Sequence, residues 1–156
     1  MVTQKKLSFT WVLVDELMVG SAPRFEDDLK QLQSEGIKSI LTLCSNEEVH
    51  IPEGIDKLFF RESFVLPDHT FKTYPKPDEI LKVLNILEKI MEHGPVYVHC
   101  FAGIERSSLI CMAWLVKKHN MEVNESLRYM MSIHKKTNPL PSQIDCLHKF
   151  KKILSK

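Results

Sequence analysis

The 156-residue sequence has few glycines, no bias of charge and no long hydrophobic run. Its 21 basic and 20 acidic residues leave a net charge of +1, which gives no electrostatic reason to expect nucleic-acid or membrane partners. Any anion site must therefore be local. The N-terminal stretch has lysines but neither a sustained apolar core nor a small-residue cleavage site. We therefore expect no secretion signal, no transmembrane span and a cytoplasmic location.

The sequence also lacks the CxxC pairs that metal sites and thioredoxin-like motifs use, because its four cysteines lie far apart. We therefore predict no metal and no cofactor. Cys44, Cys111 and Cys146 lie in apolar or helical patterns, which favours the interpretation that they are small buried hydrophobes. Cys100 differs from these three because of the residues around it.

Short apolar runs alternate with longer periodic segments along the chain. Five runs bounded by turn residues are typical of strands: 11–14, 17–19, 37–43, 57–60 and 95–99. Five segments have helical spacing: 25–35, 77–93, 106–119, 124–135 and 144–154. The 44% apolar content suffices for one core. We predict a single α/β domain over residues 1–156, with a central, mainly parallel sheet of about five strands and helices on both faces.

The stretch VHCFAGIERSS, residues 98–108, carries the strongest chemical signal. Cys100 follows a predicted strand and precedes a helix that begins near Arg106, with five residues between the two. A loop in this position can point successive backbone N–H groups inward, and the positive end of the helix adds to the attraction for an oxyanion. The predicted phosphate-binding residues are Phe101, Ala102, Gly103, Ile104, Glu105 and Arg106. The Arg106 guanidinium can donate to two phosphate oxygens at once.

The same surroundings favour Cys100 as a nucleophile. A thiol at a positive helix end has its pKa lowered from about 8.5 toward roughly 3.5 to 7.5, so thiolate is available at neutral pH. Ser107 is placed to hydrogen-bond the sulfur and to steady it as a leaving group. We expect His99 to order the loop by hydrogen bonding rather than to transfer a proton.

A phosphate ester also needs a proton for its departing oxygen, and a carboxylic acid on a movable loop suits that task. Asp68 lies in the irregular segment 62–77, a long loop of the kind that is often functional. Protonated, it would act as the acid; ionised afterwards, it would activate the hydrolytic water. In the plain alternative, Asp68 only braces the turn after Pro67, since Glu62, His69 and Asp78 also occupy or flank this loop.

The segment HCFAGIERSS resembles the His-Cys-x-x-Gly-x-x-Arg-Ser/Thr signature of the cysteine-dependent protein tyrosine phosphatases. With LPD upstream, the chain is similar to a small atypical dual-specificity phosphatase, and the likeness covers most of the 156 residues. The resemblance implies that Cys100 is the nucleophile, Arg106 binds the transferred group, Ser107 assists thiolate release and Asp68 is the general acid and base. It implies no metal. Glu105 departs from many relatives, which have a small or neutral residue there.

The segment KKTNPLPSQ, residues 135–143, resembles the part of this family that closes the pocket rim. In that interpretation Gln143 helps to position water. The alternative is a turn and a helix start, with Pro141 near the first helical position.

The expected function is hydrolysis of phosphotyrosine, and also of phosphoserine and phosphothreonine, through a phosphocysteine intermediate. The Glu105 charge disfavours heavily phosphorylated lipids and RNA ends, so we expect a phosphorylated protein or peptide as substrate and a monomeric enzyme. Three alternatives remain open: a phosphoinositide or RNA-end phosphatase with the same mechanism, a rhodanese-like sulfur carrier, and a non-catalytic phosphate-binding adaptor.

Overall fold

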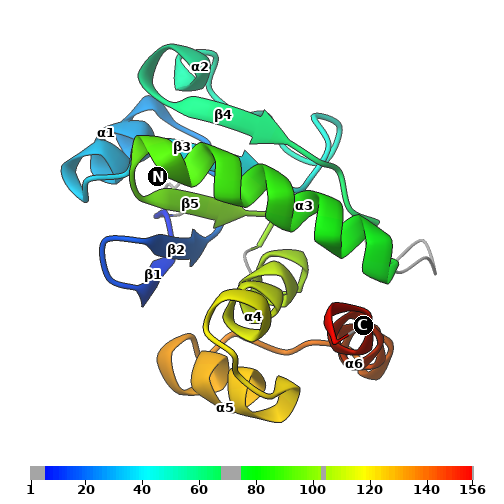
Figure 1. Ribbon diagram of the computed structural model, residues 1–156. Coiled ribbons are helices and arrows are strands. Elements are labelled where there is room, and N and C mark those ends of the chain that lie inside the picture. The colour runs from blue at the N-terminus through cyan, green and yellow to red at the C-terminus, as the bar shows by residue number, and fades with distance from the viewer. Residues whose placement is uncertain (1–5, 68–74, 103–104, 156) are drawn as a thin grey trace.

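A five-stranded sheet forms the centre of the molecule (Figure 1). The computed structural model describes residues 6–67, 75–102 and 105–155. The strands are β1 (Phe9–Leu13), β2 (Leu17–Gly20), β3 (Ser39–Thr42), β4 (Phe60–Ser63) and β5 (Val96–His99). Their order is β1-β2-β5-β3-β4, with β1 antiparallel to β2 and every other neighbouring pair parallel. The predicted α/β fold with a mainly parallel sheet is confirmed.

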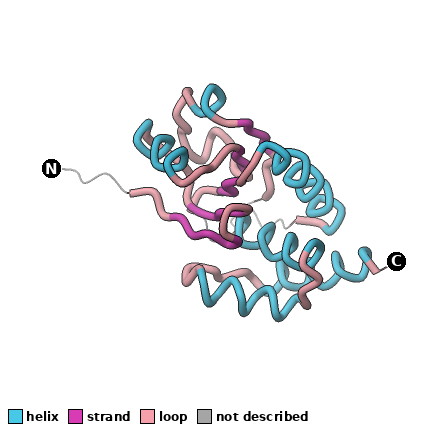
Figure 2. The backbone as a smooth tube through the Cα atoms, turned by 60° about the vertical axis from the view of Figure 1, so that its left-hand side comes forward, coloured by secondary structure: helices cyan, strands magenta, loops and turns pink. Residues whose placement is uncertain are grey.

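Helices surround the sheet (Figure 2). They are α1 (Glu26–Ser34), α2 (Ile55–Leu58), α3 (Pro77–Ile90), the 3₁₀ helix η2 (Met91–His93), α4 (Arg106–Lys118), α5 (Val123–Ile133) and α6 (Pro141–Leu154). Residues of α1 and α2 share one apolar cluster with the sheet, and residues of α3 to α6 share another. Helices therefore cover both faces. No helix in the described ranges is long and apolar enough to cross a membrane.

The two clusters follow from the alternation of side chains along each strand. On β5, Val96 and Val98 belong to the cluster of α3 to α6, whereas Tyr97 between them belongs to the cluster of α1 and α2. Each of these three side chains is fully buried. Because parallel strands covered on both faces bury both sets of side chains, β5 reads as a continuous apolar run in the sequence.

The prediction of a strand over residues 57–60 is wrong. Residues Ile55–Leu58 form a one-turn helix, and β4 begins only at Phe60. Ile55 and Phe59 are buried on the side of α1 and α2, so this short helix needs apolar residues just as a strand would. Residues 57–60 contain only three apolar residues, Leu58 to Phe60, and so short an apolar run does not show whether a strand or a helix forms. Phe60 is instead 55% exposed and stacks on His93.

The end of β2 lies very close to β1 and β5. A Cβ atom at Gly20 would lie 2.3 Å from the Ser8 carbonyl oxygen and 2.3 Å from the Tyr97 hydroxyl. That hydroxyl donates a hydrogen bond to the Ser21 carbonyl at 2.5 Å. Glycine at position 20 therefore permits both the strand contact and the buried hydrogen bond.

Gly20→Ala is expected to lower the free energy of unfolding by about 2 kcal/mol, since the added methyl group must displace backbone or break the Tyr97 bond. Urea unfolding followed by circular dichroism measures this loss. Gly54→Ala is the matched control, because its Cβ would meet only the movable Glu26 carboxylate, at 3.2 Å. Equal losses in the two variants would contradict the explanation.

Candidate active site

The site lies where the parallel strands β3 and β5 end. Thr42 at the end of β3 pairs with His99 at the end of β5, and the Leu43 amide then donates to the His99 carbonyl at 3.0 Å. The segments that follow the two strands therefore start side by side. In open α/β sheets, this carboxyl edge is the usual place for a ligand.

Cys100 is the first residue after β5, and its side chain faces the start of α4. Its Sγ lies 3.3 Å from the Ser107 Oγ, and both residues are buried. Ser107 is the second residue of α4, and the first turn of that helix contains no acidic residue. The sulfur thus lies near the N-terminal end of a helix and within reach of a hydroxyl donor.

His99 is buried and holds the end of β5 in place. Its Nδ1 lies 3.0 Å from the Cys100 carbonyl oxygen, which can only accept, so Nδ1 carries the proton. Its Nε2 lies 2.9 Å from the Thr42 hydroxyl and accepts from it. Burial, the main cause, lowers the pKa of His99 from 6.5 to about 4, which keeps the ring neutral. These contacts are those of a residue that orders the loop.

Arg106 begins α4 and is only 4% exposed. Its Nη2 donates to Glu48 Oε1 at 2.6 Å and its Nη1 donates to Glu48 Oε2 at 3.1 Å, a two-pronged ion pair. The hydrogen bond from Arg106 is the largest of the effects that lower the pKa of Glu48, so this carboxylate is charged at neutral pH. The pair fixes the guanidinium within the site instead of leaving it in solvent.

Sequence reasoning did not single out Glu48. It follows β3 in the chain, and its carboxylate also accepts from the Ser45 amide at 2.8 Å, in a turn where the Glu48 amide donates to the Ser45 carbonyl at 3.1 Å. The sequence does show that Glu48 is an acidic residue shortly after a predicted strand. Its partner could not be identified without knowing that β3 and β5 are neighbours in the sheet.

The segment after β4 also contacts the guanidinium. The Leu66 carbonyl accepts from Arg106 Nη1 at 3.3 Å, and the Leu66 amide donates to the Leu43 carbonyl at 3.0 Å. Leu66 is 1% exposed. The chain is thus anchored to the site two positions before Asp68.

Asp68, Gly103 and Ile104 lie outside the described residues. Phe101 and Ala102 are exposed next to Cys100, and Glu105 is half-buried as the residue that precedes α4.

Gln143 is buried, and its Oε1 accepts from the Leu140 amide at 2.8 Å at the start of α6. Pro141 is the first residue of that helix. These contacts are those of the alternative interpretation, a turn followed by a helix start, and the role of Gln143 with water stays a prediction.

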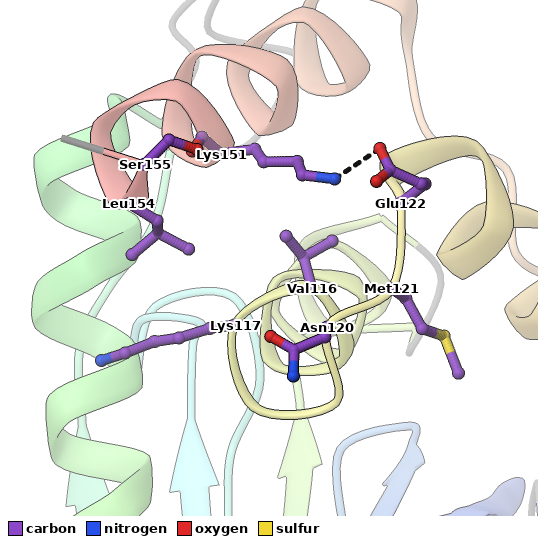
Figure 3. Close-up of a pocket in the computed structure, with 8 residues that line it drawn as sticks. All are labelled: Val116, Lys117, Asn120, Met121, Glu122, Lys151, Leu154 and Ser155. Carbon is purple, nitrogen blue, oxygen red and sulfur yellow. Dashed lines mark hydrogen bonds and ion pairs between the residues drawn. The ribbon is translucent and has the colours of Figure 1, made fainter.

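A cavity of about 440 Å³ lies between the ends of α4 and α6 and the segment before α5 (Figure 3). Lys151 forms an ion pair with Glu122 across it. Val116 and Lys117, which also line it, lie in the last turn of the 13-residue helix α4, whereas Cys100 precedes the first turn. Val116 lies ten residues after Arg106, which at 1.5 Å per residue is roughly 15 Å, so the cavity is separate from the site at Cys100.

Comparison with known families decides what kind of site this is. The family described as dual specificity phosphatase, catalytic domain, matches residues 17–153. The chain belongs to the dual-specificity phosphatase family. It is therefore a cysteine-dependent phosphatase, and the resemblance seen in the loop around Cys100 is confirmed.

Relatives of this phosphatase have different substrates in their names. Phosphatidylglycerophosphate phosphatase PTPMT2 of Arabidopsis thaliana is 26% identical over 146 residues, which cover 93% of this chain and 64% of that protein. Dual specificity protein phosphatase 2 of Mus musculus is 28% identical over 115 residues, 73% of this chain and 34% of that protein. The phosphatase thus spans less than two thirds of the length of these relatives.

A solved structure shares the fold. The crystal structure of PTPMT1 in complex with PI(5)P has a TM-score of 0.81 and 20% sequence identity, over 94% of this chain and 96% of that one. The arrangement of strands and helices is therefore the one found in this family.

Glu48→Gln is expected to lower kcat for aryl phosphate hydrolysis at least about tenfold, with a smaller change in KM, because Arg106 loses the charge that orients it. Steady-state kinetics measures both parameters. Glu47→Gln removes the same charge from an exposed neighbour and is the matched control. A fall in kcat of equal size in the two variants would contradict a positioning role for Glu48.

His99 makes stability depend on pH. Its folded pKa of about 4 lies below its ordinary 6.5, so the unfolded chain binds the proton more tightly and acid favours unfolding. The contribution of His99 to the free energy of unfolding is complete above pH 6.5. It is lost as the pH falls toward 4, and the loss at pH 5 is about 2 kcal/mol. Urea unfolding at pH 7.5 and pH 5 measures the loss. In His99→Asn, which keeps a donor for the Cys100 carbonyl, the free energy of unfolding should depend less on pH. An unchanged pH dependence would refute the assignment to His99.

Proposed function

We propose that this phosphatase removes the terminal phosphate monoester from a glycerophospholipid headgroup of the phosphatidylglycerophosphate type. The observation that carries the chemistry is the pairing of the Cys100 sulfur with the Ser107 hydroxyl at the start of α4, with Arg106 buried beside it. The lipid substrate is supported by the named activity of a relative that aligns with 93% of this chain. The sequence favoured a protein substrate, and the comparisons favour the lipid alternative instead.

In the proposed reaction, the Cys100 thiolate attacks phosphorus and the bond from phosphorus to the headgroup oxygen breaks. Arg106 donates to oxygens of the phosphoryl group as it moves. Asp68 gives its proton to the departing oxygen and then takes one from the water that attacks the phosphocysteine. Phosphate leaves, and Ser107 donates to the sulfur as it becomes a thiolate again. The anchoring of Leu66 to Arg106 supports the assignment of Asp68, two positions later in the sequence.

The proposed substrate implies that the protein binds a lipid surface. The net charge of the sequence gave no reason to expect such a partner. Glu105 was the main argument against lipids, but it directly precedes α4, and the positive N-terminal end of that helix offsets its charge. The cytoplasmic location expected from the sequence stays a prediction.

A second candidate is dephosphorylation of phosphotyrosine in proteins. It is favoured by the relative from Mus musculus, a dual specificity protein phosphatase that aligns with 73% of this chain. Both candidates use the same reaction at Cys100, so substrate preference alone separates them.

The test compares wild-type kcat/KM for phosphatidylglycerophosphate in mixed micelles with that for a tyrosine-phosphorylated peptide. We expect the lipid value to be at least about tenfold higher, and Cys100→Ser to hydrolyse neither. Cys146→Ser is the matched control, since a hydroxyl can replace the thiol that donates to the Pro75 carbonyl. A preference for the peptide would shift the assignment to the second candidate. Wild-type rates in Cys100→Ser would refute the cysteine mechanism for both.

A further inference from the structure

A groove of about 320 Å³ lies beside the catalytic loop, and we call it the cation groove. It combines basic side chains with apolar ones. Among the residues that line it are Lys6, Leu7, Arg24, Phe101, Ala102 and Lys136. Four parts of the chain that are separate in sequence thus meet at one concave surface.

The cation groove is continuous with the catalytic loop. Phe101 and Ala102, which line it, are the two residues that follow Cys100 in the sequence. The Ala22 amide donates to the Phe101 carbonyl at 3.1 Å, and the Ser21 amide donates to the Ser8 carbonyl at 2.9 Å. These backbone bonds tie the wall of the groove to the loop. Phe101 and Ala102 therefore belong both to the predicted phosphate-binding loop and to the lining of the groove.

The charge of the groove is positive and largely unneutralised. Within the described parts of the chain, Lys6, Arg24 and Lys136 form no ion pair. The guanidinium of Arg24 instead lies over the Phe101 ring, 5.0 Å from its centre. Cations that converge on a concave surface without carboxylate partners attract an anion.

Asp28 is an acidic residue in the lining, and its carboxylate is already engaged. Its Oδ2 accepts from the Arg24 amide at 2.8 Å and from the Phe25 amide at 3.1 Å. Asp28 is 8% exposed. Its charge offsets one of the three cations, and the lining keeps a net positive charge.

We propose that the cation groove binds the phosphodiester of the substrate while the terminal phosphate lies in the catalytic loop. This inference rests on the proposed lipid substrate, in which one glycerol unit joins the phosphodiester to the terminal phosphate. Arg24 and Lys136 are the residues that distinguish a headgroup with two phosphorus atoms from one with a single phosphate. The side chain of Phe101, which is 41% exposed, favours a diester flanked by carbon chains over a second phosphate on a peptide.

The test uses two soluble compounds, glycerophosphoglycerol phosphate, which is the headgroup without its acyl chains, and glycerol 3-phosphate. The measured quantity is the ratio of kcat/KM for the first to kcat/KM for the second. We expect this ratio to fall about tenfold in Arg24→Gln and in Lys136→Gln, and further in the double variant, since each loses a charged donor to the diester. Lys30→Gln is the matched control, an exposed lysine on α1 that does not line the groove, and should keep the wild-type ratio.

A second measurement separates this proposal from the proposed function. Calorimetric binding of the two compounds to Cys100→Ser reports on the groove without turnover, and the double variant should lose the preference for the headgroup. If wild type hydrolyses both compounds but the double variant keeps the wild-type ratio, the groove proposal is wrong and the function stands. If binding shows no dependence on Arg24 or Lys136, the groove proposal also fails. A preference that depends on these residues only for a doubly phosphorylated peptide would overturn the assignment to a diester.

Discussion

The parallel pairing of β3 with β5 is the constraint on which the rest of the site depends. It brings the ends of both strands to the same edge of the sheet, so the segment before Glu48 and the loop after Cys100 start together. The buried apolar side chains of both strands hold this pairing from two sides. A shift by one residue would exchange the two faces and bury the wrong side chains. The register of β3 against β5 that buries the apolar side chains therefore also fixes the position of the Cys100 sulfur.

Charge is the second requirement, because Arg106 is a cation taken almost entirely out of water. A buried cation without a partner is strongly unfavourable, and the carboxylate of Glu48 compensates for it with two hydrogen bonds. The carbonyl of Leu66 accepts a further bond. The guanidinium is thus oriented before substrate arrives, so the protein need not reorganise it during the reaction. In the cation groove, by contrast, the charges lie nearer the surface, and among the described residues they have no carboxylate partner in an ion pair.

The sequence predicts the parts of the site that are contiguous in the chain. Cys100, Arg106 and Ser107 lie within eight residues between a strand and a helix, and the local order of elements is enough to orient them. Glu48 cannot be predicted in this way, because its partner Arg106 is 58 positions away and only the order of the strands brings the two residues together. The strand predicted over 57–60 is wrong because its apolar residues serve a short helix equally well. The cation groove is equally non-local, since Lys6, Arg24 and Lys136 come from three separate segments.

The central claim is that the sulfur of Cys100 becomes bonded to phosphorus during the reaction. Rapid acid quench of the Ser107→Ala variant mixed with an aryl phosphate, followed by mass spectrometry of the intact protein and its peptides, tests this most directly. Without the hydroxyl that lies 3.3 Å from the sulfur, breakdown of the intermediate should slow and one phosphoryl group should accumulate on Cys100. Turnover with a phosphoryl group on another residue, or with none on the protein, would contradict the account.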